Sequence, residues 1–80
     1  MRITVVCFGA LRERVPGAGE GPVVIDLPDG ASVADVVEAL SVPRALASMV
    51  LVDGNRVELD EVVSEGAAVT LMPPFAGGAT

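Results

Sequence analysis

Hydrophobic side chains alternate with other side chains in several short stretches of this chain, and such a period of two predicts β-strands. Within residues 2–8, the odd-numbered side chains form one apolar face, which is predicted to enter the core, and the even-numbered ones form the opposite face. Further strands are predicted over residues 23–27, 49–53, 56–59 and 67–72. The connection between the first two strands is short, so we expect them to pair antiparallel. Asp53-Gly54 is typical of a hairpin turn.

One segment changes to the period of a helix. Its apolar stripe has the spacing i, i+3, i+4 and i+7 and consists of Val33, Val36, Val37 and Leu40. The hydroxyl of Ser32 is predicted to cap the first turn, Asp35 lies near the positive end of the helix dipole, and Pro43 is predicted to stop the helix. Short helical turns are predicted within residues 9–15 and 44–48. Strands combined with one main helix indicate an α+β domain.

Charge and composition narrow the classes of partner. The 80 residues are enough for one domain, carry a net charge of −6, and have arginine at every basic position. Nucleic acids and anionic membranes require clustered lysine and arginine, so we expect neither as a partner. The acidic balance favours a partner with a basic docking face, or it serves only solubility.

Few residues in the chain could perform chemistry. It has no histidine, lysine or tyrosine, so the usual general bases are missing and Cys7 has no histidine to activate it. A single cysteine in an apolar run is predicted to be a buried, inert thiol, and it cannot by itself form a disulfide or a metal site. We therefore expect no autonomous catalytic site, no metal and no permanently bound cofactor. Without a targeting segment or a membrane-length apolar run, the protein is expected to be cytoplasmic.

The C-terminal segment is the most informative part of the chain. It reads Met72-Pro73-Pro74-Phe75-Ala76-Gly77-Gly78-Ala79-Thr80. Proline has no N–H for a sheet ladder, so the two prolines are predicted to end the last strand. Glycine has no Cβ, so a Gly-Gly stretch can lie extended in a slot too narrow for other residues. We interpret residues 1–74 as the folded domain and residues 75–80 as a flexible tail that presents a carboxyl group.

The chain resembles the small subunit of molybdopterin synthase, a ubiquitin-like sulfur carrier (MoaD/ThiS-like), over essentially residues 1–78. The segments that carry the resemblance are Glu65 to Gly78, Phe8-Gly9-Ala10-Leu11-Arg12-Glu13, Ser32-Val33-Ala34-Asp35-Val36 and Val50-Leu51-Val52-Asp53-Gly54. The resemblance implies a β-grasp fold. Such a fold is a mixed sheet of four to five strands, with the last strand parallel to the first and one main helix packed on one face.

The resemblance also implies an activity. In such carriers, an E1-like adenylating enzyme uses ATP to adenylate the C-terminal glycine carboxylate, which corresponds here to Gly78. A sulfur donor then converts the acyl-adenylate into a thiocarboxylate. The tail enters the large subunit of molybdopterin synthase, where the sulfur passes to a pterin precursor. ATP is thus used by the activating enzyme, and the carrier supplies only the reacting carboxyl group.

Two features depart from the pattern of that family. Ala67 and Ala68 occupy positions at which the family commonly has acidic residues. In addition, Ala79 and Thr80 follow Gly78, so the glycine carboxyl group is held in a peptide bond. Some related carriers are trimmed by a metalloprotease, and we expect cleavage between Gly78 and Ala79 before activation. The alternative is that the last two residues are an inert end of a diverged protein.

The open face of such a sheet is the expected docking surface. Val6, Phe8, Thr70 and Met72 fall on the face opposite the predicted core. The predicted partner-binding residues are Phe8, Leu59, Met72, Pro73, Pro74, Phe75, Ala76 and Gly77. Phe75 follows the last strand and is the expected anchor. For Phe8, the alternative is that its ring folds over the sheet edge into the core.

Other functions are compatible with the sequence. A carrier of the same chemistry could serve another pathway, such as thiazole (thiamine) or cysteine formation, with a different sulfur acceptor enzyme. A ubiquitin-like interaction module would bind a partner without carrying sulfur, and the Gly-Gly pair would then be incidental. An RNA-binding β-grasp is at odds with the net charge of −6.

Overall fold

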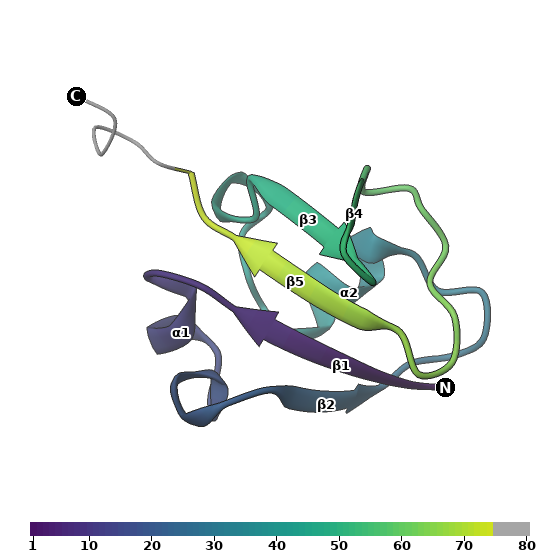
Figure 1. The fold of residues 1–80 in the computed structure, drawn as a ribbon, viewed down its shortest axis with the longest axis horizontal. Coiled ribbons are helices and arrows are strands. Elements are labelled where there is room, and N and C mark those ends of the chain that lie inside the picture. Colours follow the sequence, from purple (N-terminus) through teal and green to yellow (C-terminus); the bar gives the residue numbers. More distant parts are fainter. Residues whose placement is uncertain (75–80) are drawn as a thin grey trace.

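The computed structural model describes residues 1–74, and its strands form one mixed sheet in the order β2-β1-β5-β3-β4 (Figure 1). The strands are β1 (Arg2–Cys7), β2 (Val23–Asp26), β3 (Met49–Val52), β4 (Asn55–Val57) and β5 (Ala68–Met72). The helices are α1 (Leu11–Arg14) and α2 (Val33–Ala39), with 3-10 turns η1 (Ala18–Glu20) and η2 (Arg44–Leu46). Each predicted strand is therefore confirmed to within a residue or two at its ends.

The neighbouring strands β1 and β5 are parallel, and all other neighbours in the sheet are antiparallel. Thr4 lies opposite Ala68 and Cys7 lies opposite Leu71 in the parallel pair. Parallel neighbours cannot be joined by a tight turn, and here the long connection between them includes α2 and the β3–β4 hairpin. This is the β-grasp topology, so the predicted fold is confirmed.

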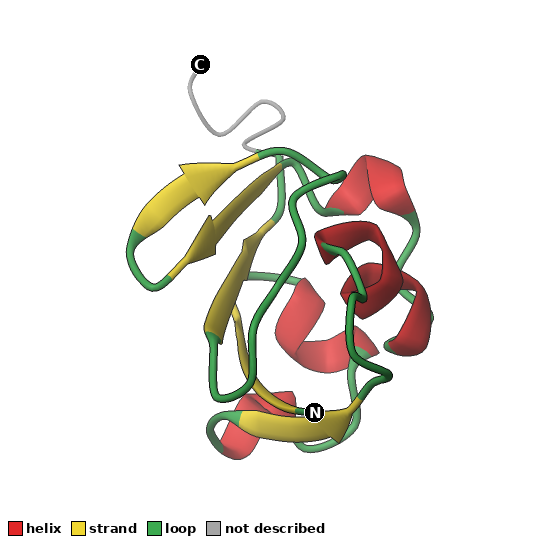
Figure 2. Ribbon diagram, turned by 90° about the vertical axis from the view of Figure 1, so that its right-hand side faces the viewer, coloured by secondary structure: helices red, strands yellow, loops and turns green. Residues whose placement is uncertain are grey.

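One face of the sheet is covered and the other is open. α2 lies across one face (Figure 2), and no described element lies over the opposite face, which is turned toward the viewer in Figure 1. The buried cluster between sheet and helices consists of Ile3, Val5, Cys7, Leu11, Val15, Ala18, Val33, Val36, Val37, Leu40, Val42, Ala47, Val50, Val63, Ala67, Val69 and Leu71. It contains the odd-numbered residues of β1 and the whole predicted stripe of α2. The apolar face of the strand and the apolar stripe of the helix therefore face each other.

The first turn of α2 is held by a reciprocal pair of side-chain contacts. The Ser32 hydroxyl accepts a hydrogen bond from the backbone N–H of Asp35 (3.3 Å), and the Asp35 carboxylate accepts one from the backbone N–H of Ser32 (2.8 Å). This is a capping box, which satisfies two backbone donors that the helix itself leaves unpaired. The predicted cap at Ser32 is confirmed.

The last turn of α2 ends before the predicted stop at Pro43. Ser41 adopts a left-handed conformation (φ 58°), and the N–H of Val42 donates to the carbonyl of Val37 (3.1 Å). This 6→1 bond closes the helix end, because it satisfies a terminal carbonyl that has no partner within the helix. The helix therefore stops through its own backbone geometry, and the proline lies in the segment beyond it.

Leu59 was predicted to lie in a strand and on the docking surface, and this placement is wrong. β4 ends at Val57, and the carbonyl of Leu59 accepts a hydrogen bond from the N–H of Ala34 in α2 (2.8 Å). The Leu59 side chain packs against the buried cluster. The chain leaves the sheet after three paired residues, so the alternation of β4 no longer applies at position 59.

Candidate functional site

The candidate site begins where β5 ends. Because β1 and β5 are parallel, both strands end at the same side of the sheet, and the chain beyond β5 leaves from there (Figure 1). The N–H of Phe8 donates to the carbonyl of Leu71 (3.1 Å), which extends the pairing one residue past β1. On its other side, Met72 pairs with Met49 of β3. The last paired residue before the prolines is therefore held between two neighbouring segments.

Pro73 packs against Gly9, which is the residue that follows Phe8. Gly9 has a positive φ of 59°, and a Cβ built onto it would lie 2.9 Å from Cγ of Pro73. Non-bonded carbon atoms prefer separations of about 3.5–4.0 Å. The absence of a side chain at position 9 therefore leaves the space that the Pro73 ring occupies. In the sequence, the signal for Gly9 is a glycine between a predicted strand and a predicted helical turn, within the Phe8-Gly9-Ala10-Leu11-Arg12-Glu13 segment.

The predicted site residues divide into those that the structure describes and those that it does not. Pro73 is half-buried and Pro74 is exposed at the end of the described chain. Phe75, Ala76, Gly77, Gly78 and Ala79 lie outside the described residues. The roles assigned to those residues stay predictions, as does the division of the chain into residues 1–74 and 75–80.

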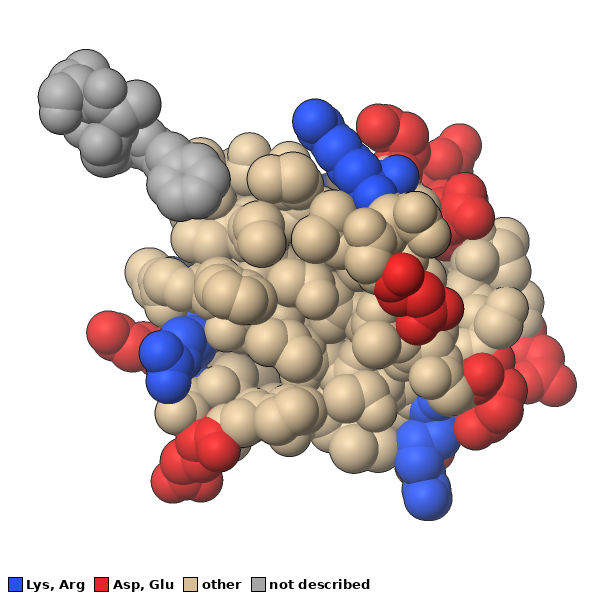
Figure 3. All heavy atoms as spheres, in the orientation of Figure 1, with Lys and Arg blue, Asp and Glu red and all other residues tan. Residues whose placement is uncertain are grey.

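An apolar patch covers much of the open face of the sheet. We call it the open-face patch, and its members are Val6, Phe8, Val24, Met49, Leu51, Thr70 and Met72. Phe8 and Val24 are exposed, and the other members are half-buried. Cross-strand register places Val6 beside Thr70, Thr70 beside Leu51, and Met72 beside Met49. In Figure 3 the centre of this face carries no charged side chains. Most acidic and basic side chains lie around its rim, and one acidic side chain lies on the face to the right of its centre. An exposed apolar area with a charged rim is typical of an interaction surface.

The exposure of side chains on this face tests the predicted docking residues in two ways. The Phe8 side chain is 47% exposed, so the alternative in which it folds into the core is wrong. Three members of the patch were not predicted: Val24, which is 55% exposed, and Met49 and Leu51, which are half-buried. Alternation within residues 23–27 and 49–53 could have found them, because they are the positions between the core-facing ones.

Cys7 is buried on the helix-covered side of β1. Desolvation by burial raises the pKa of its thiol. The thiolate is the reactive form of cysteine, so both burial and the raised pKa oppose reaction with an electrophile or a sulfur donor. This agrees with the prediction of an inert thiol.

We predict that Cys7 in the native protein reacts with iodoacetamide about a hundredfold or more slowly than in the urea-unfolded protein, because reaction requires opening of a domain stabilised by about 3–5 kcal/mol. Intact mass measured against time at mildly alkaline pH gives both rates. Burial raises the pKa of the Cys7 thiol in the folded protein above its pKa in the unfolded protein. The contribution of the protonated thiol to the free energy of unfolding is therefore present below the pKa of the unfolded thiol, and it is lost as the pH rises through the pKa of the folded thiol. Equal alkylation rates would contradict the buried placement.

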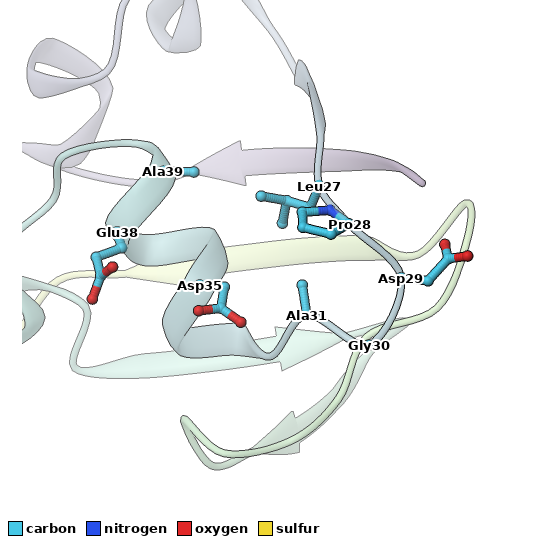
Figure 4. A pocket seen from close by; sticks show the side chains of 8 residues that line it. All are labelled: Leu27, Pro28, Asp29, Gly30, Ala31, Asp35, Glu38 and Ala39. Carbon is cyan, nitrogen blue, oxygen red and sulfur yellow. The ribbon is translucent and has the colours of Figure 1, made fainter.

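A shallow hollow lies on the helix side of the molecule. It lies between α2 and the loop before it, and its acidic lining residues are Asp29, Asp35 and Glu38 (Figure 4). The three carboxylates point in different directions, and Asp35 is engaged in the capping box. Within residues 1–74, no group of three or more histidine, cysteine or acidic side chains is arranged to hold a metal ion. No helix in this part of the chain is long and apolar enough to cross a membrane.

Comparison with known proteins identifies the family. The family model described as Mut7-C ubiquitin matches residues 1–77. The chain belongs to the Mut7-C ubiquitin family. No curated protein matches it. Since the match ends at position 77, it includes the first glycine of the Gly-Gly pair and all of the described domain.

Solved structures place this Mut7-C ubiquitin domain among small ubiquitin-like proteins. SAMP1 of Haloferax volcanii is 27% identical, with a TM-score of 0.72 over 92% of this chain and 96% of that one. A second structure, small archaeal modifier protein 1 of H. volcanii, is 28% identical, with a TM-score of 0.72 over 91% and 97%. A proposed molybdopterin converting factor, subunit 1, from Pyrococcus furiosus is 25% identical, with a TM-score of 0.71 over 92% and 98%. The predicted resemblance to ubiquitin-like MoaD-type proteins is thereby confirmed, and the comparisons add the small modifiers to it. The chain is a small ubiquitin-like protein of the modifier and sulfur-carrier type.

Proposed function

We propose that this protein is a sulfur carrier whose reacting group is the carboxylate of Gly78, freed by cleavage of the Gly78–Ala79 bond. An E1-like enzyme attaches AMP from ATP to that carboxylate and releases pyrophosphate. A hydrosulfide equivalent then attacks the carbonyl carbon and displaces AMP, which leaves a thiocarboxylate. The acceptor that we propose is molybdopterin synthase, whose large subunit receives the tail.

One observation carries the proposal: the parallel β1–β5 pair brings the chain to the end of the sheet, where both strands finish, immediately before the Pro-Pro-Phe-Ala-Gly-Gly segment. Two prolines stiffen the start of that segment, which lowers the entropy lost when an extended tail is inserted into a partner. The stretch from Met72 to Gly78 can span roughly 20 Å at about 3.3–3.6 Å per residue. In this proposal the folded domain presents the tail to its partners, and the enzymes that bind the domain supply the catalytic groups.

The open-face patch fits the same proposal. Phe8, Met49 and Met72 lie at the end of the sheet from which the tail leaves. A partner docked on this patch would be in position to take the tail at the same time. The net charge of −6 favours a partner with basic residues around its apolar contact.

A second candidate function is that of a covalent protein modifier. It is favoured by the likeness to SAMP1 and to small archaeal modifier protein 1 of H. volcanii. Both functions begin with the same adenylation of Gly78, and they differ in whether sulfur or a protein amine receives the acyl group. Since the chain has no lysine, side-chain-linked chains of the modifier with itself cannot form. A carrier for another pathway, such as thiazole or cysteine formation, would differ only in the acceptor.

The proposed function is tested with a polypeptide that ends at Gly78, an E1-like enzyme, ATP and sulfide. We expect ATP-dependent exchange of pyrophosphate and a product in which one oxygen is replaced by sulfur, as seen by intact mass. A polypeptide that ends at Gly77 is the matched control, since it has the same fold and a shorter tail. Addition of the molybdopterin synthase large subunit and a pterin precursor should then consume the thiocarboxylate. If neither exchange nor sulfur incorporation occurs at Gly78, the proposal is wrong.

Phe75 provides a separate prediction about docking. Phe75→Ala should weaken binding to the activating or acceptor enzyme by about tenfold or more, as expected for a buried aromatic anchor. The melting temperature should hardly change, because the residue follows the last strand. Titration calorimetry and thermal unfolding measure the two effects, and Leu51→Ala tests whether the open-face patch contributes to the same contact. A large loss of stability in Phe75→Ala would instead place its ring in the core.

A further inference from the structure

The contact between Gly9 and Pro73 joins two parts of the chain that are distant in sequence. Pro73 is the first residue after β5, and Gly9 is the second residue after β1. Parallel pairing brings the ends of β1 and β5 to the same side of the sheet (Figure 1), and Gly9 and Pro73 lie against each other just beyond these ends. From here the chain continues toward Gly78, so the direction in which Pro73 leaves the sheet sets where the segment beyond Pro74 begins.

Two properties make Gly9 hard to replace at this corner. Its φ of 59° is in the left-handed region, where side chains other than glycine are strained. Its missing Cβ is also what admits the proline ring, since a Cβ would lie 2.9 Å from Cγ and 3.6 Å from Cδ of Pro73. Gly30 and Gly54 also have a positive φ, of 87° each, but an added Cβ at either would meet no atom within 4 Å. Gly9 therefore combines the backbone requirement with a steric one.

The surroundings of Pro73 leave it little freedom to move away. The preceding residue, Met72, is paired with Met49 of β3, and Leu71 accepts the hydrogen bond from the N–H of Phe8. A proline has a fixed φ of about −65°, so its ring position and the chain direction after it are coupled. If a methyl group at position 9 displaced the ring, the displacement would pass into the chain beyond it.

We propose that Gly9 is a positioning residue for the carboxyl terminus: its bare backbone seats the Pro73 ring and sets the path along which the tail leaves the fold. The proposal rests on the proposed function, because the path matters only if Gly78 must reach a reaction centre. A misplacement of about 1 Å far from the chemistry can cost about a hundredfold in rate. Gly9 would therefore influence activation without touching the reacting atoms.

The test uses the polypeptide ending at Gly78 as substrate of the E1-like enzyme. Gly9→Ala should lower kcat for adenylation by about tenfold to a hundredfold. KM should change little, because the open-face patch that docks is intact. Gly30→Ala is the matched control, since it also places an alanine at a positive φ, but with open space around the added Cβ. Its kcat should stay within about twofold of the unsubstituted chain, as expected for a surface change away from the site.

Removal of the proline ring distinguishes the steric effect from general destabilisation. In a Pro73→Ala background, Gly9→Ala should lower kcat by less than about threefold, because the ring that it displaces is absent. Such a rescue would not occur if Gly9→Ala acted only by unfolding the domain. If Gly9→Ala cost the same with and without the ring, or no more than Gly30→Ala, the proposal would be overturned.

A structural measurement separates this proposal from the proposed function. In NMR spectra, the Gly9 Hα protons should show nuclear Overhauser contacts to the Pro73 ring. The amide signals of residues 75–77 should shift in Gly9→Ala and stay in place in Gly30→Ala. If no form of the chain is adenylated, the proposed function fails, and these signals still decide whether Gly9 seats the proline. Absence of the contacts, or unchanged tail signals in Gly9→Ala, would contradict the positioning role.

Discussion

A polypeptide made through Thr80 is expected to give no detectable thiocarboxylate in the time in which the same polypeptide ending at Gly78 is fully converted in an ATP-dependent reaction. In the longer form, the carbonyl carbon of Gly78 is part of an amide, and the free carboxylate belongs to a β-branched residue. A slot that accepts Gly-Gly has no room for a threonine side chain. We expect the rate of adenylation of the longer form to be lower by about a hundredfold or more, since steric exclusion adds to the misplacement of the carboxylate.

Pyrophosphate exchange measures this difference directly, and intact mass identifies the residue that carries sulfur. A third polypeptide, which ends at Ala79, shows whether a single extra residue is enough to block the reaction. Treatment of the longer form with a metalloprotease that cuts after Gly78 should restore the full rate. Formation of a thiocarboxylate on Thr80, or on uncut protein, would show that no trimming is needed.

Leu71→Ala is expected to destabilise the domain by about 2–5 kcal/mol, as for other leucines truncated in a packed core. Leu71 is 0% exposed and lies at the centre of the sheet, opposite Cys7 of β1 and Val50 of β3. A domain of this size has a stability of about 3–5 kcal/mol, so the substitution removes most of it. A large fraction of the protein should be unfolded at room temperature.

Urea unfolding followed by circular dichroism gives the free energy of unfolding of each variant. Val24→Ala is the matched control, because Val24 also lies in a strand and is 55% exposed on the open face. Its effect should be within about 0.5 kcal/mol, as for surface positions in general. If both variants lost the same free energy, the core would not lie on the covered face of the sheet.

The strands and the main helix could be predicted because the apolar positions in each have a clear period. Val5, Val36 and Leu71 all fall on the expected faces and are fully buried. The capping box at Ser32 was also visible, since a hydroxyl residue followed three positions later by an acidic residue is a local signal. Local chemistry and periodicity together were sufficient for the α+β class, and the family resemblance supplied the order of the strands.

The features that could not be predicted depend on contacts between distant segments or on backbone geometry. The seat of Pro73 on Gly9 exists only because β1 and β5 pair in parallel, so neither residue alone indicates it. Leu59 was misplaced because β4 stops at Val57 and the chain then turns toward α2. Helix α2 ends at a left-handed serine, Ser41, where sequence statistics favour glycine. The roles of residues 75–79 stay predictions, since they lie outside the described chain.

Intact mass spectrometry of the protein isolated from its own cells tests the central claim most directly. The account predicts a form that ends at Gly78, part of which carries sulfur in place of one carboxyl oxygen. The sulfur-bearing fraction should disappear when the E1-like enzyme is deleted. Protein that still carries Ala79 and Thr80, and no sulfur at any position, would contradict the claim that its working group is the carboxylate of Gly78.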